Sequence, residues 1–238
     1  LAIVPPRIPY ILLLQDLSPQ CKESNAKYVP GAKPGLFLNT QTGELFSQTS
    51  LVFAAVSGSV NEWKPRKEGG GLVTKHSLNS PVVAQAKARA AKTKTPWRRI
   101  SEEGNDLVET YTVYAVLTEN GQPTGVGVLS FKSKAIAPFQ SAMGRISGFR
   151  GGKDEPLFAH EMTMSSFDDK NTSNQEFKNF RFRPAKDDPA KSVLPGSSPV
   201  LEVAAKLRES VLSGASTADA ANEGADREAV NENTDVVF

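Results

Sequence analysis

A β-hairpin signal near the middle of the chain constrains the fold more than any other feature. Residues 107–118 are rich in β-branched and aromatic side chains, and residues 124–132 return with a similar composition, which suits a pleated, half-buried surface. Asn120 and Gly121 lie between the two segments, and Asn-Gly is the strongest short hairpin signal because both residues tolerate positive φ. The sequence therefore predicts two antiparallel strands joined by a tight turn.

A helix is predicted directly after this hairpin. Apolar residues recur there at three- and four-residue spacing, which places them on one helical face: Ile136, Phe139, Met143 and Ile146. With Ser133 as N-cap, Pro138 falls beyond the first turn and is expected to kink the helix, so that its regular part begins only at Pro138. A hairpin followed by a helix that packs back on it is typical of a small barrel.

Three further segments have a strand-like composition: residues 51–60, 157–164 and 176–183. With the hairpin and the helix they give the order β-β-β-α-β-β, which is the order of the oligonucleotide/oligosaccharide-binding (OB) barrel. The sequence therefore predicts a mainly β fold with a few helices. We expect an OB-like five-stranded barrel at its centre, with the helix between the third and fourth strands.

Four parts are predicted along the chain: an N-terminal extension with a small hairpin that packs on the barrel (1–50), the OB-like barrel with a polar insertion at 75–106 (51–183), a linker with a short helix (184–214) and an acidic tail (215–238). The insertion holds a predicted alanine-rich helix over 81–94, and the linker holds one over 200–212. The tail has almost no apolar residues before position 236, so it is expected to be disordered.

The small net charge of +2 conceals a division along the chain. Residues 217–238 carry six acidic side chains against Arg227, a net −5, so the remaining residues sum to +7. Basic bodies attract polyanions, and an acidic tail competes for the same surface. A mildly charged globule with a solubilising tail is the alternative interpretation, which composition supports equally well.

Composition and motifs argue against several classes of protein. Cys21 is the only cysteine, so no internal disulfide can form. No apolar run approaches the roughly 18 residues that cross a bilayer, and residues 8–15 lack the features of a signal peptide. The protein is therefore expected to be cytoplasmic, in the host cell if it is viral, with no membrane partner.

No convergent set of catalytic side chains is visible. His76 and His160 lack partners at ligand spacing, and no serine has a nucleophile-elbow context. Asp168 and Asp169 are adjacent on a predicted polar loop, where a solvated turn is the simpler interpretation than an acid–base pair. The sequence therefore predicts a protein that is not an enzyme and that needs no cofactor or metal.

Aromatic residues next to cations recur along the chain, and this combination is what single-stranded nucleic acid requires. Flat rings stack on bases, at about 1–3 kcal/mol per base, while cations follow the phosphates without regard to sequence. The predicted DNA-binding residues are Trp63, Lys64, Arg66, Lys67, Trp97, Arg98, Arg99, Tyr111, Phe131, Lys132, Arg150, Lys153, Phe180 and Arg181.

The alternative is that the aromatic rings fill the barrel while the cations point to water. For Phe131, Phe180 and Phe182 this interpretation is at least as good as base stacking. For Trp63 and Trp97 the binding interpretation is preferred, because both lie in predicted polar loops where a core indole is unexpected.

The tail ends in an apolar tip, with Asp235, Val236, Val237 and Phe238 as its last residues. A carboxylate beside an aromatic ring can be captured by a pocket with a basic rim. These four residues are therefore predicted to bind a partner protein.

With these features the chain resembles the single-stranded DNA-binding proteins encoded in phage replication modules. The similarity lies in a barrel of this order with a basic aromatic surface and an acidic tail ending in Phe238. It extends to the segments 29–35, 62–66 and 129–133, and covers roughly residues 29–183 and the tail. The resemblance implies sequence-independent binding and protection of single-stranded DNA in replication and recombination. It also implies recruitment of a polymerase, helicase or nuclease by the tail.

A second function class fits the same sequence. A structural or interaction protein, such as a virion component or a replisome adaptor, could use the same basic loops to bind protein. Co-purification with virions would favour this alternative, whereas salt-dependent binding of oligonucleotides favours the first.

Overall fold

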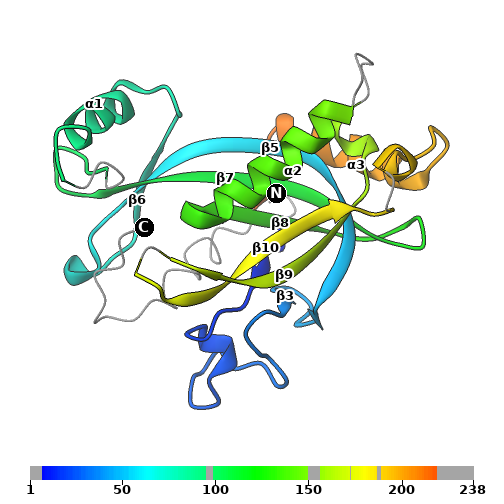
Figure 1. Cartoon of the computed structure of the whole chain (residues 1–238), viewed down its shortest axis with the longest axis horizontal. Helices are drawn as coiled ribbons and strands as arrows, with labels where there is room; N and C mark the ends of the chain where they lie inside the picture. Colours follow the sequence, from blue (N-terminus) through cyan, green and yellow to red (C-terminus); the bar gives the residue numbers. More distant parts are fainter. Residues whose placement is uncertain (1–6, 95–98, 150–155, 172, 187–188, 219–238) are drawn as a thin grey trace, which may run out of the picture.

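A sheet of long antiparallel strands lies at the centre of the molecule (Figure 1). The computed structural model describes residues 7–94, 99–149, 156–171, 173–186 and 189–218. The sheet contains β5 (Gln48–Trp63), β7 (Asp106–Glu119), β8 (Gln122–Lys132), β9 (Met162–Lys170) and β10 (Glu176–Pro184). These strands pair in the order β10-β9-β5-β7-β8, so the predicted mainly β fold is confirmed.

The order of elements along the chain is also as predicted. Strands β5, β7 and β8 precede helix α2 (Ile136–Phe149), and β9 and β10 follow it. Four of the five pairings that would close a five-stranded barrel in this order are present. Among the described strands no pairing joins β8 to β10, so the sheet is open along this seam instead of forming a closed barrel.

Helix α2 covers the seam between β8 and β10 (Figure 1). The ring of Phe139 stacks on that of Phe131 in β8, with centroids 4.8 Å apart. On the other side, Nη1 of Arg145 donates a 3.2 Å hydrogen bond to the carbonyl of Phe182 in β10. The helix therefore contacts both edge strands, which is one way that proteins protect an unpaired strand edge.

The expected kink at Pro138 is wrong. A 3-10 turn, Ser133–Ala135, precedes α2, and the α-helix begins at Ile136. Pro138 therefore lies in the first turn, where a backbone N–H would have no partner within the helix. The later start of the helix makes the proline compatible with regular geometry.

Two strand boundaries differ from the sequence-based expectation. Strand β9 begins at Met162, after a 3-10 turn at Leu157–Ala159, and it continues through Asp168 and Asp169. The sequence predicts these carboxylates in a loop, but they lie in a strand whose backbone is paired with β10 along its whole length. The polar side chains of this hairpin do not have the composition typical of a strand. Pairing with the partner strand stabilises the extended backbone instead.

The sheet is covered on both faces, which explains why residues 51–55 are apolar without alternation. The inner core includes Phe53, Val113 and Phe131 with residues of α2. The outer core joins the sheet to α3 (Pro199–Leu212) and to the N-terminal strands. These strands are β1 (Arg7–Ile8), β2 (Ile11–Leu13), β3 (Phe37–Asn39) and β4 (Leu45–Phe46).

The beginning of the predicted tail is part of the fold. Strand β11 (Thr217–Ala218) pairs in parallel with β1. The predicted disorder from residue 215 is therefore wrong for the residues up to Ala218, and residues 219–238 lie outside the described part of the chain. A bridge between Tyr10 and Val128 joins this terminal pair to β8.

The chain between β5 and β7 projects from one end of the sheet, away from α3 (Figure 1). It contains the 3-10 turn Arg66–Glu68, strand β6 (Leu72–His76) and helix α1 (Pro81–Ala90). Ser80 caps α1, as its hydroxyl accepts from the N–H of Val83. No helix in the described ranges is long and apolar enough to cross a membrane.

Candidate nucleic-acid interface

The positive charge of the protein is concentrated in the segment between β5 and β7, residues 64–105, which we call the arm. The arm contains ten lysines and arginines against three acidic residues, a net +7. The whole chain has a net charge of +2 and residues 217–238 carry −5. The residues outside the arm and this tail therefore have a net charge of zero. The basic body expected from the sequence is therefore a neutral body with a basic arm.

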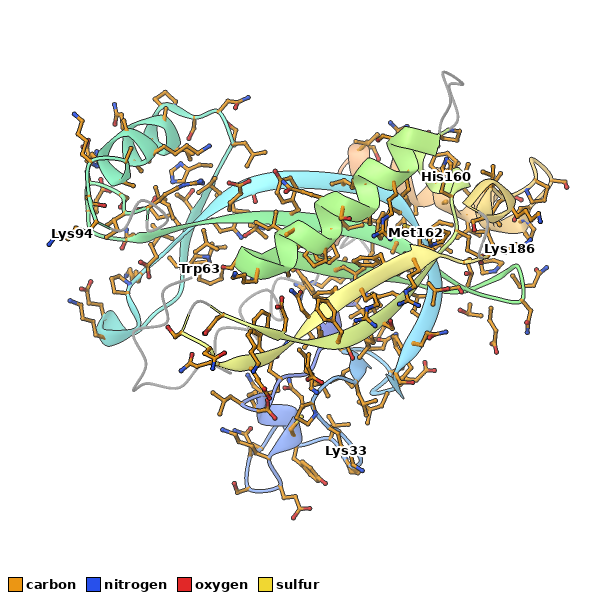
Figure 2. All side chains as sticks on the ribbon, in the orientation of Figure 1. Lys33, Trp63, Lys94, His160, Met162 and Lys186 are labelled. Carbon is orange, nitrogen blue, oxygen red and sulfur yellow. The ribbon has the colours of Figure 1, made fainter. Side chains whose placement is uncertain are left out.

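Most cations of the arm are exposed to solvent. Those that the structure describes as exposed are Lys64, Lys67, Lys75, Lys87, Arg89, Lys92 and Lys94. Figure 2 shows Lys94 at the outer end of the arm and Trp63 at its base. Arg89 forms an exposed ion pair of 3.2 Å with Glu102, which contributes little to stability. The arm therefore presents a broad positive surface.

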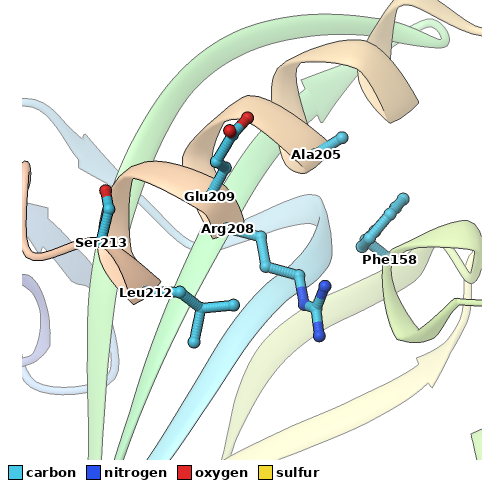
Figure 3. A pocket seen from close by; sticks show the side chains of 6 residues that line it. All are labelled: Phe158, Ala205, Arg208, Glu209, Leu212 and Ser213. Atoms are coloured by element: carbon cyan, nitrogen blue, oxygen red, sulfur yellow. The ribbon is translucent and has the colours of Figure 1, made fainter.

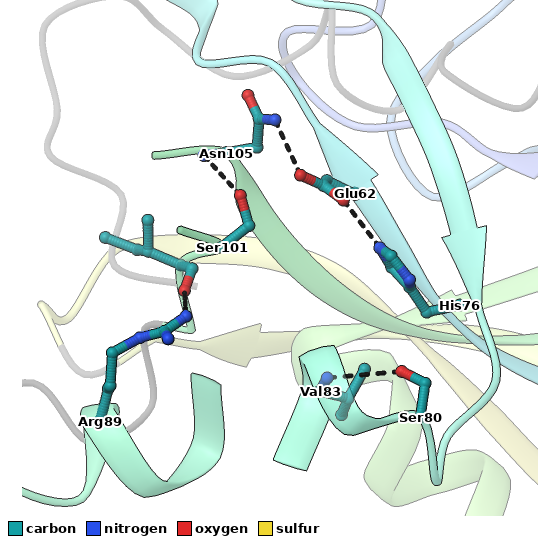
Figure 4. Close-up of polar contacts among 8 residues, drawn as sticks. Glu62, His76, Ser80, Val83, Arg89, Ser101 and Asn105 are labelled. Atoms are coloured by element: carbon teal, nitrogen blue, oxygen red, sulfur yellow. Dashed lines mark hydrogen bonds and ion pairs between the residues drawn. The ribbon is translucent and has the colours of Figure 1, made fainter. Parts of the chain in front are cut away.

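Glu62 fastens the arm to the sheet (Figure 4). Its carboxylate lies 2.7 Å from Nε2 of His76 in β6, and it accepts a 2.7 Å hydrogen bond from the amide of Asn105. The side chain is only 6% exposed. Burial alone would raise the pKa of Glu62, but hydrogen bonds from Asn105, His76 and Ser101 outweigh it and hold the pKa below its ordinary value.

Glu109 forms a second attachment on the same face of the sheet. It accepts hydrogen bonds from Nη1 of Arg99, at 2.9 Å, and from the hydroxyl of Tyr111, at 3.1 Å. Burial opposes ionisation here too, yet the bonds from Arg99 and Tyr111 lower the pKa of Glu109. Two of the predicted DNA contacts, Arg99 and Tyr111, are therefore half-buried and fix the base of the arm.

Trp63 is the last residue of β5 and is only 5% exposed, so its predicted place in an exposed loop is wrong. Its neighbours explain the burial, since it is paired with Leu72 in β6 and with Asp106 in β7. The ammonium of Lys132 lies over the indole ring, 5.7 Å from its centroid. The structure thus brings together two predicted site residues that are far apart in the sequence.

Phe131 and Phe180 lie in the inner core, with 0% and 7% of their surface exposed. Their rings are in edge-to-face contact, with centroids 5.0 Å apart. Both rings are buried in this structure, and their assignment to the DNA interface stays a prediction. The alternative interpretation of these phenylalanines as barrel-filling residues accounts for their position.

Arg181 is exposed on β10, and its guanidinium lies 4.8 Å from the ring centroid of Phe167 in β9. Phe167 is not among the predicted site residues, because the sequence places it in a loop. Strand alternation could have identified it, since Phe167 pairs with Asn179 and shares the outer face of the hairpin with Arg181.

Several predicted site residues are not placed by the structure. Trp97, Arg98, Arg150, Lys153 and the tip Asp235, Val236, Val237 and Phe238 lie outside the described residues. The backbone of Arg66 is described, in the turn after Lys64, but its side chain is not. Of the remaining predicted cations, Lys64 is exposed directly after β5 and Lys67 is exposed on this turn, both at the base of the arm.

A pocket of about 410 Å³ lies on α3, at the other end of the molecule (Figure 3). It is lined by Phe158, Ala205, Arg208, Glu209, Leu212 and Ser213. Arg208 and Glu209 are its only charged residues, and Leu212 is 68% exposed. Within the described ranges, no group of three or more potential metal ligands was found.

Comparison with known proteins finds a matching family. No curated protein and no solved structure matches the chain. A family model described as "Pam3 phage gp34-like protein" matches residues 6–217, from the start of the described fold to strand β11. The match therefore spans the sheet, the arm and α3. The chain belongs to the Pam3 phage gp34-like protein family.

Proposed function

We propose that this phage protein binds single-stranded DNA without sequence preference and does not catalyse a reaction. One observation carries the proposal: the ammonium of Lys132 lies against the ring of Trp63, at the base of an arm with a net charge of +7. An aromatic ring beside cations is the combination that binds single strands independently of sequence.

The strand order indicates where the DNA would bind. OB folds bind oligonucleotides on their second and third strands and on the loops between strands one and two and between strands four and five. The corresponding elements here are β7, β8, the arm and the β9–β10 hairpin. Part of the outer face of β7 and β8, at Tyr114, Val116 and Val128, is already covered by α3 and β1–β2. This favours the end of the sheet next to the arm.

The residues at this end have complementary tasks in the proposal. Lys64, Lys67 and Lys132 would contact phosphates and release bound counterions, which makes the affinity depend steeply on salt. Trp63 would stack on a base that replaces the ammonium of Lys132 on the ring. Because Trp63 is only 5% exposed, the ammonium of Lys132 would have to leave the ring before a base could stack there.

The acidic tail would regulate this site and recruit replication proteins such as a polymerase, helicase or nuclease. Ala218 pairs with Ile8, and Tyr10 bridges to Val128, four residues along β8 from Lys132. The 20 residues that follow Ala218 have an extended reach of up to about 66 Å. They can therefore reach the arm of the same molecule and compete with DNA for its cations.

Fluorescence titration with oligo-dT tests the proposal directly. We expect quenching of tryptophan emission, and an affinity that falls steeply as the salt concentration rises. Absence of binding at low salt, or binding without a salt dependence, would reject it.

The exposed side chain of Leu212, which lines the α3 pocket with the half-buried Phe158, favours a second candidate, a structural or interaction protein of the phage particle. Fractionation of virions separates the two candidates. Recovery of the protein with purified particles, together with no binding of oligo-dT, would support the second.

A further inference from the structure

Helix α1 and the turn that follows it, as far as the structure describes them (residues 81–94), present cations but no phenylalanine, tyrosine or tryptophan. Residues 64–94 contain no phenylalanine, tyrosine or tryptophan. Lys87, Lys92 and Lys94 are exposed on the helix and the turn that follows it, and no carboxylate pairs with Lys92 or Lys94 among the described residues. Alanines occupy exposed positions between these cations, so no bulky side chain separates the helix from a ligand.

The affinity of such a surface for a nucleic acid depends on how densely the phosphates are spaced. Duplex DNA carries one charge per about 1.7 Å of its axis, and each neutralised phosphate contributes a salt slope of about 0.9, against about 0.7 for single strands. Cations that lack stacking partners therefore bind a duplex more strongly than a single strand. This preference is opposite to that of the Trp63–Lys132 pair, where an unpaired base would replace the ammonium of Lys132 on the ring.

The two surfaces are held in a fixed relation to each other. Val83 and Ala86 of α1 pack on Val60 and Leu107 of the sheet in a small core of their own. Glu62 and the Arg99–Glu109 pair fasten the two ends of the arm. A ligand that contacts both surfaces therefore meets a helix that is packed on the sheet.

We infer that the protein prefers junctions between duplex and single-stranded DNA, with the duplex phosphates on α1 and the adjoining single strand at Trp63 and Lys132. The inference rests on the proposed binding of single strands and names the form of DNA that the complete surface fits. Linking two weak contacts in one ligand raises the affinity well above that of either contact alone.

Three probes test the inference with the full-length protein: oligo-dT of about 20 bases, a blunt duplex of about the same length, and that duplex with an oligo-dT tail. We expect the tailed duplex to bind at least about tenfold more tightly than either part. Equal affinity for the tailed duplex and oligo-dT would overturn the inference and leave the proposed function intact. Failure to bind oligo-dT would instead reject the proposed function itself.

Paired lysine variants assign the duplex contact to α1 and the turn that follows it. Lys92→Ala with Lys94→Ala is expected to abolish the advantage of the tailed duplex, because it lowers the affinity for the tailed duplex more than the affinity for oligo-dT. The control is Lys22→Ala with Lys33→Ala, which removes the same charge from two exposed lysines of the N-terminal extension. Figure 2 shows Lys33 far from the arm. If both double variants lost the affinity advantage of the tailed duplex over oligo-dT to the same extent, net charge and not this surface would cause the preference for junctions. That result would also overturn the inference.

Discussion

The ammonium of Lys132, at the end of β8, lies 5.7 Å from the centroid of the Trp63 ring at the end of β5. Strand β7 separates these two strands in the sheet, so the contact bridges across it. It marks the point where the neutral sheet meets the basic arm. A phosphate and a base could bind together there, because a cation and a ring are adjacent.

Replacement of Lys132 by alanine is therefore expected to weaken binding of oligo-dT. Loss of one phosphate contact should lower the slope of the logarithm of affinity against the logarithm of salt concentration by about 0.7. A titration series in salt measures this slope. Lys206→Ala is the control, because Lys206 is exposed on α3 and pairs only with Glu202. An unchanged slope in Lys132→Ala would remove this lysine from the interface.

Glu62→Gln is expected to destabilise the protein by about 1–3 kcal/mol, because an amide group would face the donors His76 and Asn105 in a buried site. Chemical denaturation measures the change. Glu103→Gln serves as control, since Glu103 is an exposed residue of the same arm and should change stability little. Equal stability of Glu62→Gln and the wild type would contradict the role of Glu62 as the attachment of the arm.

The pH dependence of stability should depend on both attachments of the arm, Glu62 and Glu109. The pKa values of Glu62 and Glu109 are lowered in the folded state from the ordinary value of 4.5. Their stabilising contribution is therefore complete above pH 4.5 and is lost as the pH falls through their lower, folded-state values. Thermal melts across this range should show a shallower loss in Glu62→Gln than in the wild type. A parallel loss in both proteins would mean that other carboxylates dominate.

Sequence reasoning identifies the order of the strands because each signal is local: the Asn120-Gly121 turn, the apolar run after Leu51 and the spacing of Phe139 and Ile146. It cannot place Trp63, whose burial depends on pairing with β6 and β7 from a distant part of the chain. Phe167 is an intermediate case: strand alternation can indicate its face, but only the pairing of β9 with β10 places it beside Arg181.

Gly127 should tolerate no side chain. A Cβ at this position would lie 2.6 Å from Cγ1 of Ile11, where β2 crosses close to β8. Gly127→Ala is expected to cost about 1–3 kcal/mol, as overpacking does in well-packed cores. The neighbouring Gly125→Ala is a matched control, because no atom lies within 4 Å of the position that its methyl group would occupy. Similar denaturation midpoints for the two variants would show that Ile11 can move aside at little cost.

Removal of residues 219–238 tests whether the acidic tail competes with DNA. The deletion leaves strand β11 and its pairing with β1 in place, so the fold should be retained. Since the removed segment carries five net negative charges, the affinity for oligo-dT is expected to rise at low salt. The gain should disappear at high salt, where the attraction between tail and arm is screened. Titrations of both proteins at two salt concentrations give the comparison, and an unchanged affinity at low salt would rule out competition by the tail.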